Sequence, residues 1–162
     1  MLPEPYTIRL RGPWQLEPLE QYGRRGGGGA RERSTDRLPA VARAKMPADW
    51  SAVFGPDFYG RVRYRRTFQR PTSLDEGQRV FLVVEPPRSR GTVSLAGGVL
   101  GTVRYGDPPG RYDITERLGE HNHLEIIVEH PALDDPPISN DDYPTRLSGG
   151  LIGEVRLEIE EW

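Results

Sequence analysis

Apolar and polar residues alternate along most of this chain in short runs. Between residues 61 and 69 the apolar side chains of Val62, Tyr64 and Phe68 occupy every second position, and Arg66 is the one break in that series. A period of two sends successive side chains to opposite faces of a strand, so this run predicts a strand with one buried face. The same pattern predicts one-sided strands at Tyr6 to Leu10, Leu124 to Val128 and Val155 to Ile159.

Other segments extend the series of expected strands to nine. Val80 to Val84 is apolar at every position, which is typical of a central strand covered on both faces. Shorter candidate strands are Val41 to Lys45, Thr92 to Leu95, Val99 to Val103 and Arg111 to Ile114. Helical turns are expected only at Thr115 to Leu118 and at Leu16 to Gln21.

Glycine and proline separate these segments, with 19 glycines and 16 prolines in 162 residues. This punctuation leaves little room for helices of ordinary length. Short strands with turn residues between them predict an all-β fold, specifically an antiparallel β-sandwich of the jelly-roll kind. The length fits one domain over residues 1–162.

Two stretches show no period that would order them. Residues 21–37 contain Arg24-Arg25 and four consecutive glycines from Gly26 to Gly29, which predicts a flexible loop. The loop is locally basic, so anion binding is an alternative role for it. It lacks, however, the Gly-Lys-Ser/Thr ending of a phosphate-binding loop. Residues 131–144, rich in Asp and Pro, are expected to be an irregular connection between the last two strong strands.

Charge and composition exclude several classes of function. The chain has 24 acidic and 22 basic residues, a net charge of −2, which argues against binding nucleic acid or an anionic membrane through broad electrostatic attraction. It has no cysteine, and therefore neither disulfides nor thiol chemistry. With no signal-peptide pattern and no apolar run of membrane-spanning length, a cytoplasmic location is expected.

The candidates for chemistry are few. Glycoside hydrolysis needs two carboxyl groups about 5 to 9 Å apart across one bond, and the adjacent pairs Asp134-Asp135 and Asp141-Asp142 do not indicate such an arrangement. A metal site is one interpretation of His121 and His123, since Glu125 lies on the same face as His123. Exposed histidines near a turn are the favoured interpretation. The sequence therefore predicts no catalytic residues, no metal and no cofactor.

Seven segments follow one another in an order that points to a family. They are Leu10-Arg11-Gly12-Pro13-Trp14, Met46-Pro47-Ala48-Asp49-Trp50, Phe58-Tyr59-Gly60, Tyr64-Arg65-Arg66-Thr67-Phe68, Val93-Ser94-Leu95-Ala96-Gly97 with Leu100-Gly101, Tyr112-Asp113-Ile114-Thr115 followed by Asn122-His123-Leu124-Glu125-Ile126, and Leu147 to Val155. The series resembles the sugar-binding jelly-roll domain of family 2 glycoside hydrolases, the β-galactosidase and β-glucuronidase group. Two of the family's patterns that it resembles are Tyr-x-Arg-x-Phe and Asn-x-Leu-x-Val. Gly97 and Gly101 suit turns that need positive φ, and Asp113 and Thr115 offer oxygens that cap backbone amides.

The resemblance also implies a site. In that family a loop before the closing strand carries an Asp that reaches the sugar, and Asp142 is the matching residue, with Tyr143 as a stacking surface, Asp141 as an alternative register and Arg146 following. Trp50 is a further candidate aromatic, whereas Trp14 resembles a buried plug. Ala96 and Gly153 depart from the family, which has Asn and Arg there. The family's catalytic glutamates lie on a separate (β/α)₈ barrel, and this chain ends where the jelly roll ends.

These observations favour a noncatalytic carbohydrate-binding or carbohydrate-related accessory module. Two alternatives stay open. One is an interaction module that docks a separate hydrolase chain or forms a homodimer, and the other is a fragment of a larger β-galactosidase-like enzyme. An exposed contiguous apolar patch would favour docking over sugar binding.

Overall fold

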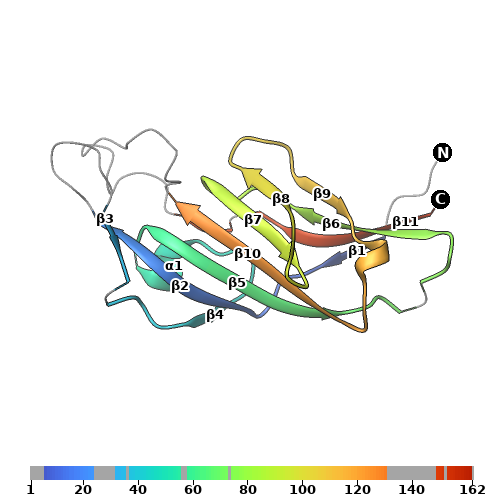
Figure 1. Cartoon of the computed structure of the whole chain (residues 1–162), viewed down its shortest axis with the longest axis horizontal. Coiled ribbons are helices and arrows are strands. Elements are labelled where there is room, and N and C mark those ends of the chain that lie inside the picture. The colour runs from blue at the N-terminus through green and yellow to red at the C-terminus, as the bar shows by residue number, and fades with distance from the viewer. Residues whose placement is uncertain are drawn as a thin grey trace.

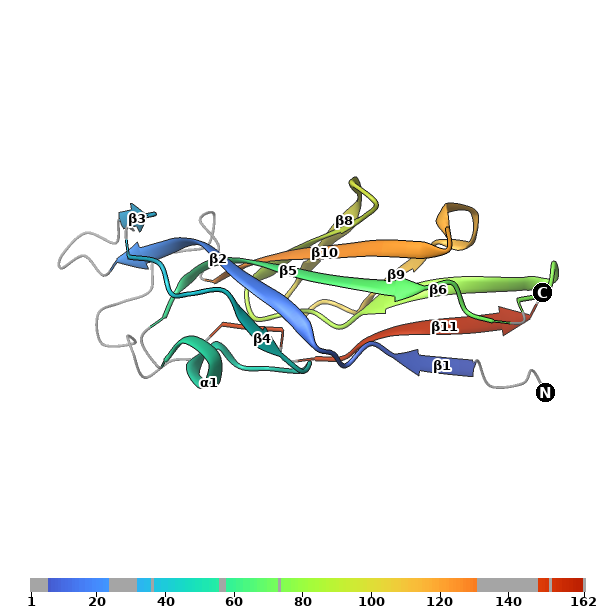
Figure 2. The same ribbon diagram turned by 90° about the horizontal axis from the view of Figure 1, so that it is seen from below.

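The alternating segments form two antiparallel sheets packed face to face (Figures 1 and 2). The computed structural model describes residues 6–23, 32–35, 37–55, 58–72, 74–130, 149–151 and 153–161. Within these ranges the smaller sheet has the order β1 (Tyr6–Arg9), β11 (Val155–Glu161), β6 (Gln78–Val84) and β9 (Gly110–Asp113). The larger sheet has the order β3 (Glu32–Ser34), β2 (Trp14–Gly23), β5 (Gly60–Gln69), β10 (His121–His130), β7 (Arg90–Leu95) and β8 (Gly98–Arg104), with β4 (Ala42–Ala44) also paired to β2.

This arrangement confirms the predicted antiparallel β-sandwich of the jelly-roll kind. Each of the nine expected strands overlaps an observed one, and β2 and β3 are additional. A 3₁₀ turn, η1 (Thr115–Arg117), forms at the first expected helical turn. A five-residue helix, α1 (Trp50–Phe54), begins after Asp49, whose side chain caps the Ser51 amide at 2.8 Å.

The helical turn expected at Leu16 to Gln21 is wrong, because these residues lie inside β2. The pairing of β2 with β5 is irregular between Pro18 and Glu20, and this irregularity breaks the simple alternation of the strand. The expected loop at 21–37 is also strand at both of its ends, since Gln21 pairs with Ser34 in the ladder of β2 and β3. Residues 24–31 lie outside the described ranges.

The inward side chains of both sheets make one apolar core. The fully buried Trp14 donates its indole N–H to the Leu10 carbonyl at 2.7 Å, as its predicted structural role requires. Arg66 is the exception on the inward face of β5, where it lies directly opposite the buried Leu124.

The central position of β6 agrees with its continuous apolar sequence. Val80, Leu82 and Val84 face the core, while Phe81 and Val83 lie on the other face and are also buried. The Arg111 guanidinium lies 3.6 Å from the centre of the Phe81 ring, so an arginine covers part of this outer face.

The predicted turns are partly confirmed. Gly97 has φ +84° and Ala96 has φ +51°, so both central residues of the β7–β8 turn are left-handed. Gly101, in contrast, is not in a turn. It lies in β8, where a Cβ would come within 2.8 Å of the Tyr112 ring. Asp113 Oδ1 accepts from the Thr115 amide at 3.0 Å, which confirms the predicted cap.

Candidate functional site

The four loop residues predicted to bind a sugar, Asp141, Asp142, Tyr143 and Arg146, lie outside the described residues, so their roles stay predictions. The structure does show where that loop starts and ends. It leaves β10 at His130 and the chain is described again at Gly149. The two ends of the loop therefore lie at the end of the sandwich that carries α1 (Figure 1).

Glycine is required where the chain returns from this loop. Gly149 accepts a hydrogen bond from the Trp50 amide at 2.9 Å, and a Cβ on Gly149 would overlap the Trp50 ring. Gly150 has φ +132°, and its Cβ would lie 2.6 Å from the Ala48 carbonyl oxygen. Gly149 and Gly150 thus let the main chain lie directly against residues 48–50.

Trp50 is a core residue in this structure. Its side chain is 0% exposed, its indole N–H donates to the Tyr64 hydroxyl at 2.7 Å, and its ring meets Phe58 edge-on at 5.2 Å between centroids. No face of the ring is presented to a ligand. The interpretation of Trp50 as a sugar-binding aromatic is therefore wrong for this conformation, because the ring is enclosed by the core.

The Tyr64 hydroxyl joins three of the family-like segments. It accepts from Trp50 and also from the amide of Leu151 at 3.3 Å. Burial raises the pKa of the Tyr64 hydroxyl above its ordinary value, so the group stays neutral at physiological pH. This contact ties β5, α1 and the segment before β11 together.

His130 fixes the other end of the loop. It is 8% exposed, its Nδ1 lies 2.6 Å from Ser89 Oγ, and its ring stacks obliquely on Tyr59 at 5.7 Å between centroids. Next to it Arg88 pairs with Asp49 at 3.2 Å. The loop predicted to bind a sugar is thus held at both ends by packed side chains.

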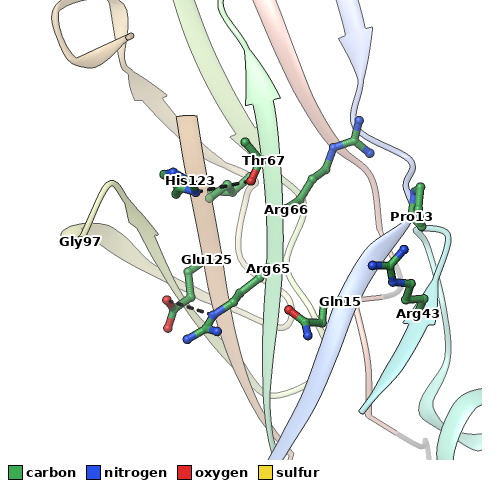
Figure 3. Close-up of a pocket in the computed structure, with 10 residues that line it drawn as sticks. Pro13, Gln15, Arg43, Arg65, Arg66, Thr67, Gly97, His123 and Glu125 are labelled. Carbon is green, nitrogen blue, oxygen red and sulfur yellow. Dashed lines mark hydrogen bonds and ion pairs between the residues drawn. The ribbon is translucent and has the colours of Figure 1, made fainter. Parts of the chain in front are cut away.

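A second candidate lies on the outer face of the seven-stranded sheet (Figure 3). A groove of about 440 Å³ crosses β10, β5, β2 and β4, and this volume falls within the range of about 300–1,000 Å³ for small-ligand sites. Its outward polar side chains are Gln15, Arg43, Arg65, Thr67, His123 and Glu125. We call this the β5 groove.

The register of four strands builds the groove. Gln15 pairs directly with Arg43 on one side and Arg65 on the other, and Arg65 pairs with Glu125. Directly paired residues share a face of a sheet, and neighbouring strands lie about 4.8 Å apart. Guanidinium, amide, guanidinium and carboxylate groups therefore form one row across the sheet.

The contacts within the groove leave most of this row open. Arg65 Nε lies 4.0 Å from Glu125 Oε2, whereas Arg63, just outside the groove, approaches Glu125 Oε1 more closely at 3.1 Å. Thr67 Oγ1 and His123 Nδ1 lie 3.4 Å apart. Planar polar groups of this kind bind the paired hydroxyls of sugars.

The same lining does not provide the arrangement for glycoside hydrolysis. Among the described residues that line the groove, Glu125 is the one carboxylate, and hydrolysis needs two. Among the described residues no cluster of three or more His, Asp or Glu side chains could hold a metal ion. No helix in the described part of the chain is long and apolar enough to cross a membrane.

The β5 groove is not evident from the sequence. Two local signals are present, the outward polar positions of the 61–69 strand and the inward Arg66. The pairing that brings Arg43 and Gln15 beside that strand has no local signal.

The fold defines an all-β, antiparallel β-sandwich domain, and the β5 groove lies on the outer face of its larger sheet. No protein-family model matches the sequence, and no curated protein matches it. Solved structures do match over nearly the whole chain.

The structures similar to this chain are glycoside hydrolases of family 2. An FMN-binding β-glucuronidase from Facaelibacterium prausnitzii L2-6 is 25% identical with a TM-score of 0.70, over 96% of this chain and 22% of that one. A Bifidobacterium dentium β-glucuronidase is 21% identical with a TM-score of 0.66, over 98% of this chain and 30% of that one. A putative β-galactosidase from Bacteroides fragilis is 21% identical with a TM-score of 0.64, over 98% of this chain and 24% of that one.

These matches confirm the resemblance that the sequence motifs predicted. The chain has the fold of one domain-sized part of these enzymes and spans 18–30% of their length. The described residues contain no (β/α)₈ barrel, the domain that carries catalysis in that family according to the resemblance.

Proposed function

We propose that this chain is a noncatalytic carbohydrate-binding module and that the β5 groove is its binding surface. The observation that carries the proposal is the row formed by Arg43, Gln15, Arg65 and Glu125. These side chains come from four paired strands, so a rigid sheet holds donors and acceptors at the spacing of the strands. The similarity to carbohydrate-active enzymes supports a saccharide as the ligand.

The scarcity of apolar surface on the described residues favours this function over protein docking. The exposed large apolar side chains are Tyr6, Val41, Val99 and Tyr105, at 51–68% exposure. They lie on β1, beside β4 and at the two ends of β8, and so are scattered over separate elements. Scattered single residues of this kind are normal for a surface and do not mark an interface.

A glycan array followed by calorimetric titration of the whole chain tests the proposal. We expect binding of at least one oligosaccharide in the micromolar to millimolar range, because an open groove buries little of its ligand. Arg65→Gln should weaken binding at least about tenfold, a loss of about 1.4 kcal/mol. Arg9→Gln, an exposed arginine on β1 of the other sheet, serves as the matched control and should change nothing.

The predicted loop site is a separate candidate that the same assay distinguishes. Asp142→Ala should weaken binding if the loop, with Asp141, Tyr143 and Arg146, contacts the sugar. Loss in Asp142→Ala with no change in Arg65→Gln would move the site from the groove to the loop. A flat response of folded protein to every saccharide would remove the proposal.

Docking to a separate hydrolase chain is the second candidate function. One observation favours it, namely that the matched structures carry this fold within chains three to five times longer. Light scattering during size-exclusion chromatography checks for a dimer, and co-elution with a barrel-bearing hydrolase checks for a partner. A monomer that binds sugar in isolation would exclude docking as the main function.

A further inference from the structure

The β5 groove is positively charged in a protein that is negative overall. Among the described residues, Arg43 and Arg65 line its outward face, the inward-facing Arg66 lies at its edge, and Glu125 is the one carboxylate. The formal charge of these four described residues is therefore +2, whereas the net charge of the whole chain is −2. A local excess of positive charge on a protein of negative net charge favours anionic ligands at that place.

The charge on this lining is poorly neutralised. Arg43 is exposed and makes no ion pair or hydrogen bond with any described residue. The single carboxylate is engaged more closely by Arg63, at 3.1 Å, than by Arg65, at 4.0 Å. Arg43 and Arg65 flank Gln15 in one row (Figure 3), so a ligand lying over Gln15 meets a guanidinium on each side.

Arg66 adds a third charge of a different kind. Figure 3 shows it on the other side of β5 from Thr67, pointing toward the start of β2. Its Nε and Nη1 are buried and have no hydrogen-bond partner among the described residues. Burial lowers the pKa of the Arg66 guanidinium below its ordinary value. Arg66 is half-buried overall, so its charge is screened less than that of the exposed Arg43 at the edge of the groove.

A binding surface for neutral sugars does not need this charge. Hydroxyl groups are bound as well by amides, by carboxylates and by paired guanidinium groups, and an unpaired buried cation disfavours folding. A carboxylate ligand, in contrast, fits the planar fork of a guanidinium with two parallel hydrogen bonds. The groove combines two such accessible forks with a third, half-buried positive charge at its edge.

We propose that the β5 groove binds an acidic saccharide, with a sugar carboxylate held over Gln15 between Arg43 and Arg65. This inference rests on the proposed carbohydrate-binding function and specifies its ligand class. Arg66 contributes long-range attraction, and Arg43 and Arg65 make the direct contacts. Binding involves no covalent step.

Two tetrasaccharides that differ only in charge test the inference, namely an oligogalacturonide and its fully methyl-esterified form. We expect the acid to bind the whole chain at least about tenfold more tightly at about 20 mM salt, and the ratio to shrink at about 500 mM salt because screening weakens exposed ion pairs. Arg43→Gln and Arg65→Gln should each remove most of the preference. Arg9→Gln should keep it.

Arg66→Met gives a readout that a structural role would not produce. Arg66 is a half-buried cation whose Nε and Nη1 have no hydrogen-bond partner among the described residues, so replacing it by an apolar side chain of similar length is expected to leave the melting temperature unchanged or to raise it. The same variant should bind the acid about threefold or more weakly, since one weakly screened charge is lost. A lower melting temperature together with unchanged affinity would show that Arg66 only stabilises the fold.

The remaining outcomes separate the inference from the function on which it rests. Equal binding of the acidic and the esterified sugar overturns the inference and supports carbohydrate binding. Tighter binding of a sulfated tetrasaccharide than of the oligogalacturonide overturns the choice of carboxylate. Equal binding of a glutamate tetrapeptide overturns a saccharide ligand, and failure of every sugar to bind overturns both proposals.

Discussion

Replacing Tyr64 with phenylalanine removes one hydroxyl from the core and leaves two N–H donors without their acceptor. These donors are the Trp50 indole, 2.7 Å from the hydroxyl oxygen, and the Leu151 amide, 3.3 Å from it. All three residues are 0% exposed, so water does not reach the donors in the folded state. The variant keeps the ring and its packing, which isolates the hydrogen bonds from the apolar contacts.

The expected loss follows from the two unsatisfied donors. Each buried donor that loses its partner costs about 1–3 kcal/mol, and the longer bond to Leu151 belongs at the low end of this range. Together they predict a decrease of about 2–4 kcal/mol in the free energy of unfolding. For a domain of 162 residues, about 2–4 °C of melting temperature corresponds to each kcal/mol, so the midpoint should fall by roughly 5–15 °C.

Urea and thermal unfolding measure this change directly. The urea dependence of the free energy should be unaltered, because the same surface is exposed on unfolding. Tyr105→Phe is the matched control, since Tyr105 is 58% exposed and its hydroxyl loss should stay within about 0.5 kcal/mol. A loss of under about 0.5 kcal/mol in Tyr64→Phe would refute the reasoning and show that the two donors find other acceptors.

Three other variants test separate features of the fold. Ala96 has a left-handed conformation in a two-residue turn, and such turns favour the sequence Asn-Gly. Ala96→Asn should therefore raise the free energy of unfolding in urea by about 0.5–1 kcal/mol. A decrease would contradict the turn assignment. A Cβ on Gly60 would overlap a main-chain carbonyl of β2, whereas a Cβ on Gly119 meets no atom closer than 3.8 Å. Gly60→Ala should therefore lower the free energy of unfolding by more than about 2 kcal/mol, whereas Gly119→Ala should leave it almost unchanged. Equal effects of the two substitutions would exclude the steric explanation. The hydrogen bond from the Thr115 side chain lowers the pKa of the Asp113 carboxyl group in the folded state. The Asp113 carboxylate therefore stabilises the fold at pH values above the ordinary aspartate pKa of about 3.9. This stabilisation is lost as the pH falls through the lower pKa of the folded state. Asp113→Asn should then show a smaller drop in melting temperature between about pH 5 and pH 2 than the wild type, and an identical acid profile would argue against the cap.

The strands were predictable because their signal is local. An alternation such as Val62, Tyr64 and Phe68 needs only neighbouring residues and the geometry of a pleated strand. The error at Leu16 to Gln21 has the same origin. The ladder of β2 is irregular after Pro18, so the period of two breaks there, and the apolar Leu16 and Leu19 at a spacing of three then imitate a helical turn.

Burial of single aromatic residues and the β5 groove could not be predicted in the same way. Trp50 as an amino-acid type suits either a core or a sugar platform, and only the contacts with Tyr64 and Gly149 decide between them. The groove depends on strand pairing between segments far apart in the chain. Its register places Arg43 and Gln15 beside Arg65, which no local period indicates.

One departure from the family pattern, Gly153, also has a local explanation. Gly153 replaces an arginine of the pattern, and here a Cβ at this position would lie 2.5 Å from the Cβ of Glu85. Glu85 in turn accepts from the Glu154 amide at 2.9 Å. Glycine at 153 is therefore required by the placement of Glu85 in this chain.

The motifs and the groove occupy different positions of the same strands, and this separation decides what the resemblance can say. In the Tyr-x-Arg-x-Phe pattern, Arg65 and Thr67 fill the variable positions. In Asn-x-Leu-x-Val, His123 and Glu125 fill them. The fixed apolar and Asn positions point inward, where Tyr64, Phe68, Asn122, Leu124 and Ile126 are buried. Since alternate residues of a strand face opposite sides, similarity in the motifs reports the core and the inward Arg66, and carries no information on the outward row of Arg43, Gln15, Arg65 and Glu125. Enzymes that share the inward residues of this chain can differ at every outward position that a ligand in the groove would touch. The ligand of this chain therefore has to be identified by experiments on its own outward residues.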